Sequence, residues 1–114
     1  MTEIEVKIEF DAFKERTAGD KNLMCELLSC FKNEFSDTRN TLTKLLLTND
    51  NVGVANELHK LKGSIGIFGF SNVSEKICEL ENLAKSENCS SIADDIKCLL
   101  NAIEEHIEIL EKSI

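Results

Sequence analysis

Apolar residues recur at steps of three and four along most of the chain, which is the spacing that places them on one face of an α-helix. No segment alternates apolar and polar residues as a half-buried strand would. The pattern predicts a short first helix that ends near Gly19 and four longer helices: residues 20–47, residues 51–70, and two that begin near Ser71 and Ser90. Short turns between long amphipathic helices make successive helices antiparallel. The predicted fold class is therefore all-α: an antiparallel four-helix bundle with an additional short N-terminal helix.

Polar residues at the expected helix starts support these boundaries. Asp20 and Asp50 each precede an apolar-periodic stretch, where a carboxylate can accept a hydrogen bond from a free backbone N–H group. The predicted buried stripes are Leu23, Leu27, Cys30, Phe31, Phe35, Leu42, Leu45 and Leu46 in the second helix, Val73, Ile77, Leu80 and Ala84 in the fourth, and Ile92, Ile96, Leu99, Ile103, His106 and Leu110 in the fifth.

Length and composition narrow the class of protein. A chain of 114 residues with 42% hydrophobic residues makes a single domain, over residues 1–114, that can build its core without disulfides or metal. The net charge of −8 argues against nucleic-acid binding, which needs a basic surface. No apolar run reaches the roughly 20 residues that a membrane helix needs, and the first ten residues lack the pattern of a signal peptide. We expect a cytoplasmic, monomeric protein without membrane insertion.

The cysteines do not suggest a covalent or metal framework. There are five of them, an odd number, and none is in a C-x-x-C spacing: Cys25, Cys30, Cys78, Cys89 and Cys98. A disulfide scaffold or zinc site is therefore not expected. We predict that most of them are small buried apolar side chains in a reducing compartment.

Candidate chemistry lies in residues 58–70, where three of the five glycines interrupt an otherwise helical stretch. Each mid-helix glycine costs about 1 kcal/mol relative to alanine, so the glycines call for a compensating reason. A helical wheel at about 100° per residue places His59 some 140° from the centre of the apolar stripe, so the imidazole is predicted to face solvent. Lys62, Gly63 and Gly66 share its sector.

This arrangement is suited to phosphoryl transfer. A neutral imidazole is a nucleophile near pH 7, a lysine one turn away can neutralise a phosphoryl group, and bare backbone lets another macromolecule approach closely. An exposed histidine beside a lysine is, on the other interpretation, only a solvated helix face. The glycines are alternatively sites of close helix packing, which we favour for Gly69 at the edge of the stripe. His106 lies within the apolar stripe of the last helix, so a structural role is predicted for it.

The run His59-Lys60-Leu61-Lys62-Gly63-Ser64, followed by Gly69, resembles the H-x-L-K-G-[S/A] signature of histidine-containing phosphotransfer (HPt) domains. The resemblance covers most of the chain. Residues 19–23 are similar to the start of the family's long first bundle helix, and residues 78–81 to its next helix after the signature. Leu58 departs from the family, where many members have a small residue before the histidine.

The resemblance implies that His59 is the phosphoacceptor, that Lys62 neutralises the phosphate, and that Gly63 leaves room for the incoming protein. Ser64 matches the small position that follows. The helical wheel adds Ala55, Gly66 and Phe70 to the docking surface for that protein, although Phe70 can equally cap the core at the end of its helix.

The expected function is that of a phosphocarrier in a two-component phosphorelay, which shuttles a phosphoryl group between receiver-domain aspartates and His59. The expected partners are response-regulator receiver domains and a hybrid sensor histidine kinase. No cofactor or metal site is expected in the chain, since the resemblance places Mg²⁺ on the receiver. No glycine-rich phosphate loop follows a strand, so the chain is not expected to be an enzyme with its own ATP site. Two alternatives remain: the phosphoacceptor domain of a chemotaxis-type or hybrid histidine kinase, and a non-catalytic helical adaptor.

Overall fold

The computed structural model describes residues 11–68, 71–86 and 89–114, and all regular structure in these residues is helical. Residues 11–16 are helical and lead through a turn into the first of four long helices. These are α2 (Lys21–Leu47), α3 (Asn51–Ile65), α4 (Ser71–Ser86) and α5 (Ala93–Ser113), with short 3₁₀ turns η1 (Gly66–Phe68) and η2 (Cys89–Ile92). The predicted all-α fold, four long helices and a short N-terminal one, is confirmed.

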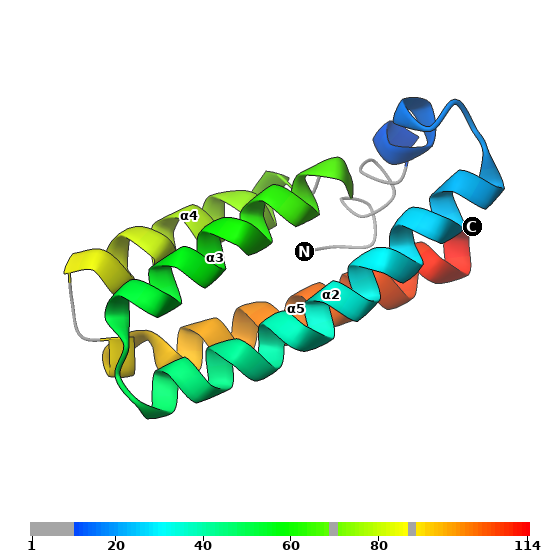
Figure 1. Cartoon of the computed structure of the whole chain (residues 1–114). Coiled ribbons are helices and arrows are strands. Elements are labelled where there is room, and N and C mark those ends of the chain that lie inside the picture. The colour runs from blue at the N-terminus through cyan, green and yellow to red at the C-terminus, as the bar shows by residue number, and fades with distance from the viewer. Residues whose placement is uncertain (1–10, 69–70, 87–88) are drawn as a thin grey trace.

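The four long helices form two pairs (Figure 1). Helices α2 and α5 run side by side, α3 and α4 make the second pair, and α2 also packs against α3 and α4 against α5. Helix α2 extends beyond the end of α3, and the helical residues 11–16 lie at that end of the bundle. No described helix is both long and apolar enough to cross a membrane.

The predicted helix starts are confirmed by their hydrogen bonds. The Asp20 carboxylate accepts from the backbone N–H of Leu23 at 3.1 Å, and the Asp50 carboxylate accepts from that of Gly53 at 2.9 Å. A Cβ atom at Gly53 would lie 2.7 Å from Asp50 Oδ2 and 2.8 Å from Leu45 Cδ2. The turn between α2 and α3 therefore depends on a glycine that the hydrophobic pattern did not single out.

The end of α3 differs from the prediction. The α-helix stops at Ile65, and the 3₁₀ turn η1 then places the Phe68 ring in the core. Predicted helical residues 69 and 70 lie outside the described residues. The Arg16 guanidinium donates a hydrogen bond to the Ile67 carbonyl at 3.0 Å, and the Phe13 ring packs 4.9 Å from that of Phe68. The N-terminal helical segment therefore holds the end of α3 in place.

The predicted core is confirmed in α4 and α5 and partly wrong in α2. Leu23 and Cys30 are exposed, and the buried residues of α2 are Met24, Leu28, Phe31, Phe35, Thr38 and Leu42. Each mispredicted residue precedes a buried one by a single position, which is a rotation of about 100° around the helix. The predicted members Phe31, Phe35 and Leu42 are buried, so the stripe is correct at these positions and wrong at Leu23 and Cys30.

The prediction that most cysteines are buried is wrong for the described ones. Cys25, Cys30 and Cys98 are exposed and Cys78 is half-buried, whereas the side chain of Cys89 lies outside the described residues. These thiols lie on or near the outward faces of their helices, since the buried faces are filled by larger apolar side chains.

Candidate functional site

His59 lies in the middle of α3 on its outward face. Its neighbours on the same helix, Leu58 and Leu61, are buried, whereas 67% of the His59 side chain is exposed. The prediction that the imidazole faces away from the core is confirmed. The imidazole is therefore accessible to another molecule, while the buried side chains of the neighbouring residues fix the backbone of α3 at this position.

A buried acid on the neighbouring helix contacts the histidine ring. Glu81 of α4 has a side chain only 8% exposed, and its Oε1 lies 3.1 Å from His59 Nδ1. The sequence pattern did not predict a role for Glu81. It is four residues after Ile77 and follows Leu80, so a carboxylate on the buried side of an amphipathic helix was the signal available.

Two lysines contact the same carboxylate. Lys62 Nζ lies 3.8 Å from Glu81 Oε2, and Lys85 Nζ lies 3.4 Å from Oε1. Burial on its own would raise the pKa of the Glu81 carboxyl. The hydrogen bond from Lys85 and the charges of Lys85, His59 and Lys62 outweigh burial and lower this pKa below its ordinary value of 4.5. Glu81 is therefore ionised at neutral pH.

The ionised carboxylate determines which ring nitrogen carries the proton. A carboxylate can only accept hydrogen bonds, so the proton in the contact with Glu81 must be on Nδ1 of His59. In the neutral ring, Nε2 then carries the free lone pair. The exposed ring of His59 thus presents one nucleophilic nitrogen, Nε2, and the hydrogen bond from Nδ1 to Glu81 fixes the orientation of the ring.

We predict that part of the folding stability depends on pH through Glu81. Its pKa is depressed in the folded state, so its ionisation stabilises the fold above about pH 4.5, and this contribution is lost as the pH falls through the folded-state value. The difference in unfolding free energy between the wild type and Glu81→Gln should shrink from about pH 7 to about pH 3 in urea titrations. The other acids titrate in both proteins and cancel in the difference. A difference that stays constant with pH would contradict the depressed pKa.

The two described glycines beside the ring face open space. Gly63 and Gly66 are exposed, and a Cβ atom built at either meets no atom within 4 Å. Their lack of a side chain is therefore not explained by helix packing inside the chain. Gly69, for which a packing role was favoured, lies outside the described residues.

The remaining residues for which the sequence predicted a role differ in how far they are exposed. Ala55 is only 2% exposed, so its assignment to the docking surface is wrong: α3 is covered by both α2 and α4, and its buried sector is wider than the predicted stripe. Ser64 is half-buried and its hydroxyl donates to Glu34 Oε1 of α2 at 2.9 Å. Phe70 lies outside the described residues. His106 is buried, and its Nδ1 lies 2.6 Å from the Ala102 carbonyl, in agreement with a structural role.

Apolar side chains that sequence analysis did not single out are exposed at both ends of α3. Val52 in the first turn is 71% exposed, and Ile67 in η1 is 41% exposed. Val52, His59 and Gly63 are separated by seven and four residues, which places them along one face of α3. Among the described residues, no group of three or more histidine, cysteine or acidic side chains is arranged to hold a metal ion.

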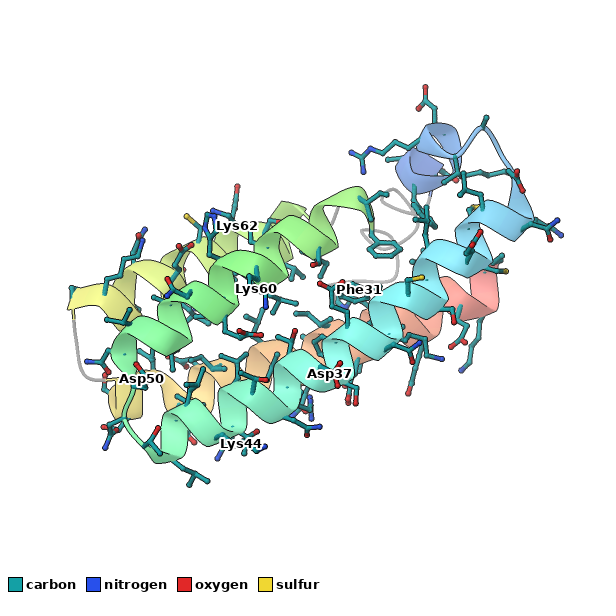
Figure 2. The ribbon with its side chains drawn as sticks, viewed as in Figure 1. Phe31, Asp37, Lys44, Asp50, Lys60 and Lys62 are labelled. Atoms are coloured by element: carbon teal, nitrogen blue, oxygen red, sulfur yellow. The ribbon has the colours of Figure 1, made fainter. Side chains whose placement is uncertain are left out.

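Lys62 and Lys60 lie on opposite sides of α3, and Lys62 projects away from α2 and α5 (Figure 2). Side chains two residues apart on an α-helix differ in direction by about 200° around the axis, which accounts for the opposite sides. Lys60 pairs with Glu57 at 3.9 Å, and no contact with Glu81 is found for it. Of these two lysines beside His59, Lys62 is therefore the one in the charge cluster with Glu81.

Most of the chain matches a known protein family. The family model described as the Hpt domain matches residues 26–112. The sensor protein EvgS of Escherichia coli (strain K12) is 27% identical over 111 residues, which cover 94% of this chain and 9% of the relative. The chain therefore spans about a tenth of that relative's length. No solved structure gives a significant match.

Proposed function

Because this chain belongs to the Hpt domain family, we propose that it is a phosphocarrier in which His59 accepts a phosphoryl group from a receiver-domain phospho-aspartate and passes it to another receiver aspartate. The observation that carries this assignment is the His59–Glu81 contact. It leaves an exposed ring with Nδ1 occupied and Nε2 free.

The transfer balances without a further reactant. The Nε2 lone pair attacks phosphorus, the N–P bond forms, and the P–O bond to the receiver aspartate breaks with its electron pair leaving on the carboxylate oxygen. The ring, protonated at Nδ1, gains a positive charge, which the Glu81 carboxylate faces at 3.1 Å. Lys62 supplies a cation for the phosphoryl oxygens. We propose that Mg²⁺ is contributed by the receiver.

The docking surface that we propose follows the exposed face of α3. Gly63 and Gly66 provide clearance beside the ring, and Ser64 and Phe70 remain proposed members of its border. Val52 and Ile67 are seven and eight residues from His59, which is roughly 10–12 Å along a helix axis. A typical partner covers about 800 Å², a patch with a radius of about 16 Å. A receiver positioned on His59 would therefore also contact these two apolar side chains.

A second candidate is the same chemistry within a longer signalling protein. The similarity to a small part of a sensor protein supports a hybrid sensor histidine kinase as the partner of this domain or as the chain that contains it. In either arrangement the phosphoryl group comes from another domain, because the described regular structure is all helical and the sequence lacks a glycine-rich phosphate loop after a strand.

The decisive experiment is labelling by a panel of receivers that carry a radioactive phosphoryl group, with Mg²⁺ present. We expect an acid-labile, alkali-stable label on this chain from at least one receiver. A parallel arm with a histidine kinase domain and ATP but no receiver tests the chemotaxis-type alternative, which predicts direct labelling. Absence of label from every receiver would overturn the proposed relay function. Label from the kinase arm alone would then favour the chemotaxis-type alternative, and no label in either arm would favour the adaptor interpretation.

We predict that Lys62→Ala slows phosphoryl uptake by about tenfold, because a cation that contacts the phosphoryl group contributes about 1–2 kcal/mol. The matched control is Lys60→Ala, which removes the same charge one residue from His59 but outside the Glu81 cluster. Rapid-quench transfer from a labelled receiver measures both, and the control should change by less than about twofold. Equal rates for Lys62→Ala and the wild type would remove the assigned role.

A further inference from the structure

Lys85 is the third member of the charge cluster, and the proposed transfer chemistry gives it no direct task. It lies in the last turn of α4, four residues after Glu81, with 59% of its side chain exposed. A glutamate four residues N-terminal to a lysine is the favourable order for such a pair on a helix. Lys85 contacts the carboxylate behind the ring, and no contact with the His59 ring is found for it.

The two oxygens of Glu81 are used differently. Oε1 accepts from His59 Nδ1 and from Lys85 Nζ, whereas Oε2 is paired with Lys62 Nζ. Lys62 can therefore leave the carboxylate without disturbing the oxygen that orients the ring.

Departure of Lys62 has an electrostatic consequence for Glu81. Once a phosphoryl group is near Nε2, Lys62 has a second, more highly charged anion to neutralise. If Lys62 were the sole lysine bound to Glu81, its departure would leave a carboxylate of 8% exposure with no lysine. Until the N–P bond forms and the ring becomes cationic, the imidazole gives this carboxylate a hydrogen bond but no compensating charge. A buried charge without a compensating one is costly, so Lys62 would be held between two competing anions.

The structure assigns Lys85 as a positioning residue that keeps the Glu81 carboxylate paired on Oε1 while Lys62 moves to the phosphoryl group. This inference rests on the proposed phosphocarrier function.

The experiment compares phosphoryl uptake by Lys85→Met with that by Lys76→Met. Lys76 is on the same helix and is paired with Glu79 at 3.7 Å, away from Glu81, so it controls for the loss of one charge. We expect Lys85→Met to be about fivefold slower than the wild type and Lys76→Met to be unchanged. Lys85→Arg, which keeps the cation, should restore most of the rate.

A second background separates this role from a general charge effect. In Glu81→Gln the neutral amide needs no cation, so adding Lys85→Met should change the rate by less than about twofold. Circular dichroism of every variant establishes that the helices are intact.

The outcomes for the two proposals are distinguishable. A wild-type chain that no receiver labels contradicts the phosphocarrier function itself. A wild type that is labelled, with Lys85→Met as fast as Lys76→Met, overturns only the role of Lys85. An effect of Lys85→Met that is equally large in the Glu81→Gln background also overturns it, because the effect would not pass through that carboxylate.

Discussion

Replacing His59 with glutamine is expected to lower phosphoryl uptake by at least about a thousandfold from every receiver that labels the wild-type chain. The amide of glutamine has no nucleophilic lone pair comparable to that of Nε2, so no N–P bond can form at this position. The fold should be retained, because the side chain is largely exposed and glutamine is a good helix former. Uptake is measured as acid-labile label per chain, and helicity by circular dichroism.

The matched control is His106→Gln, which removes the other of the two histidines in the sequence. It should keep the label, since His106 is buried in α5 and contacts the Ala102 carbonyl. If this variant is too unstable to test, peptide mapping of the labelled wild type locates the phosphoryl group directly. Label retained by His59→Gln, or mapped to another residue, would refute the assignment.

Replacing Gly63 with glutamine is expected to slow phosphoryl transfer while raising the stability of the fold. Its side chain would meet no atom of the chain near Cβ, and glutamine is a better helix residue than glycine, so the unfolding free energy should rise by about 0.5–1 kcal/mol. The same side chain would stand one turn from His59, in the space that a receiver needs. We therefore expect transfer to fall by about a hundredfold, since misplacement of reacting groups by about 1 Å can have an effect of this size.

Side chains of increasing size at Gly63 test whether the loss of transfer is steric. Gly63→Ala should gain a similar stability and lose much less transfer than Gly63→Gln, and Lys76→Gln controls for a new glutamine elsewhere on the surface. Urea titration gives stability and rapid-quench assays give transfer. A loss of several kcal/mol in Gly63→Gln would instead make Gly63 a packing residue, and unchanged transfer would remove its role in clearance.

Local sequence patterns were sufficient for much of the fold. The carboxylates of Asp20 and Asp50 start their helices as predicted, because a cap depends on residues only three positions apart. The stripes of α4 and α5 were also correct, since a spacing of three and four residues defines one face of a helix. The same geometry was enough to place His59 on the outward face of α3.

The packing of neighbouring helices decided the features that these local patterns did not predict. Periodicity gives the angle between residues on one helix but not how much of its circumference other helices cover. Ala55 was therefore predicted exposed and is buried, whereas Leu23 and Cys30 of α2 were predicted buried and are exposed. The pairing of His59 with Glu81 joins residues 22 positions apart, and it arises only because α3 and α4 lie side by side. The sequence by itself determined which helices form and where the imidazole points. Tertiary packing decided which charges surround that imidazole, because contacts between helices depend on relative position and rotation, which no local spacing contains.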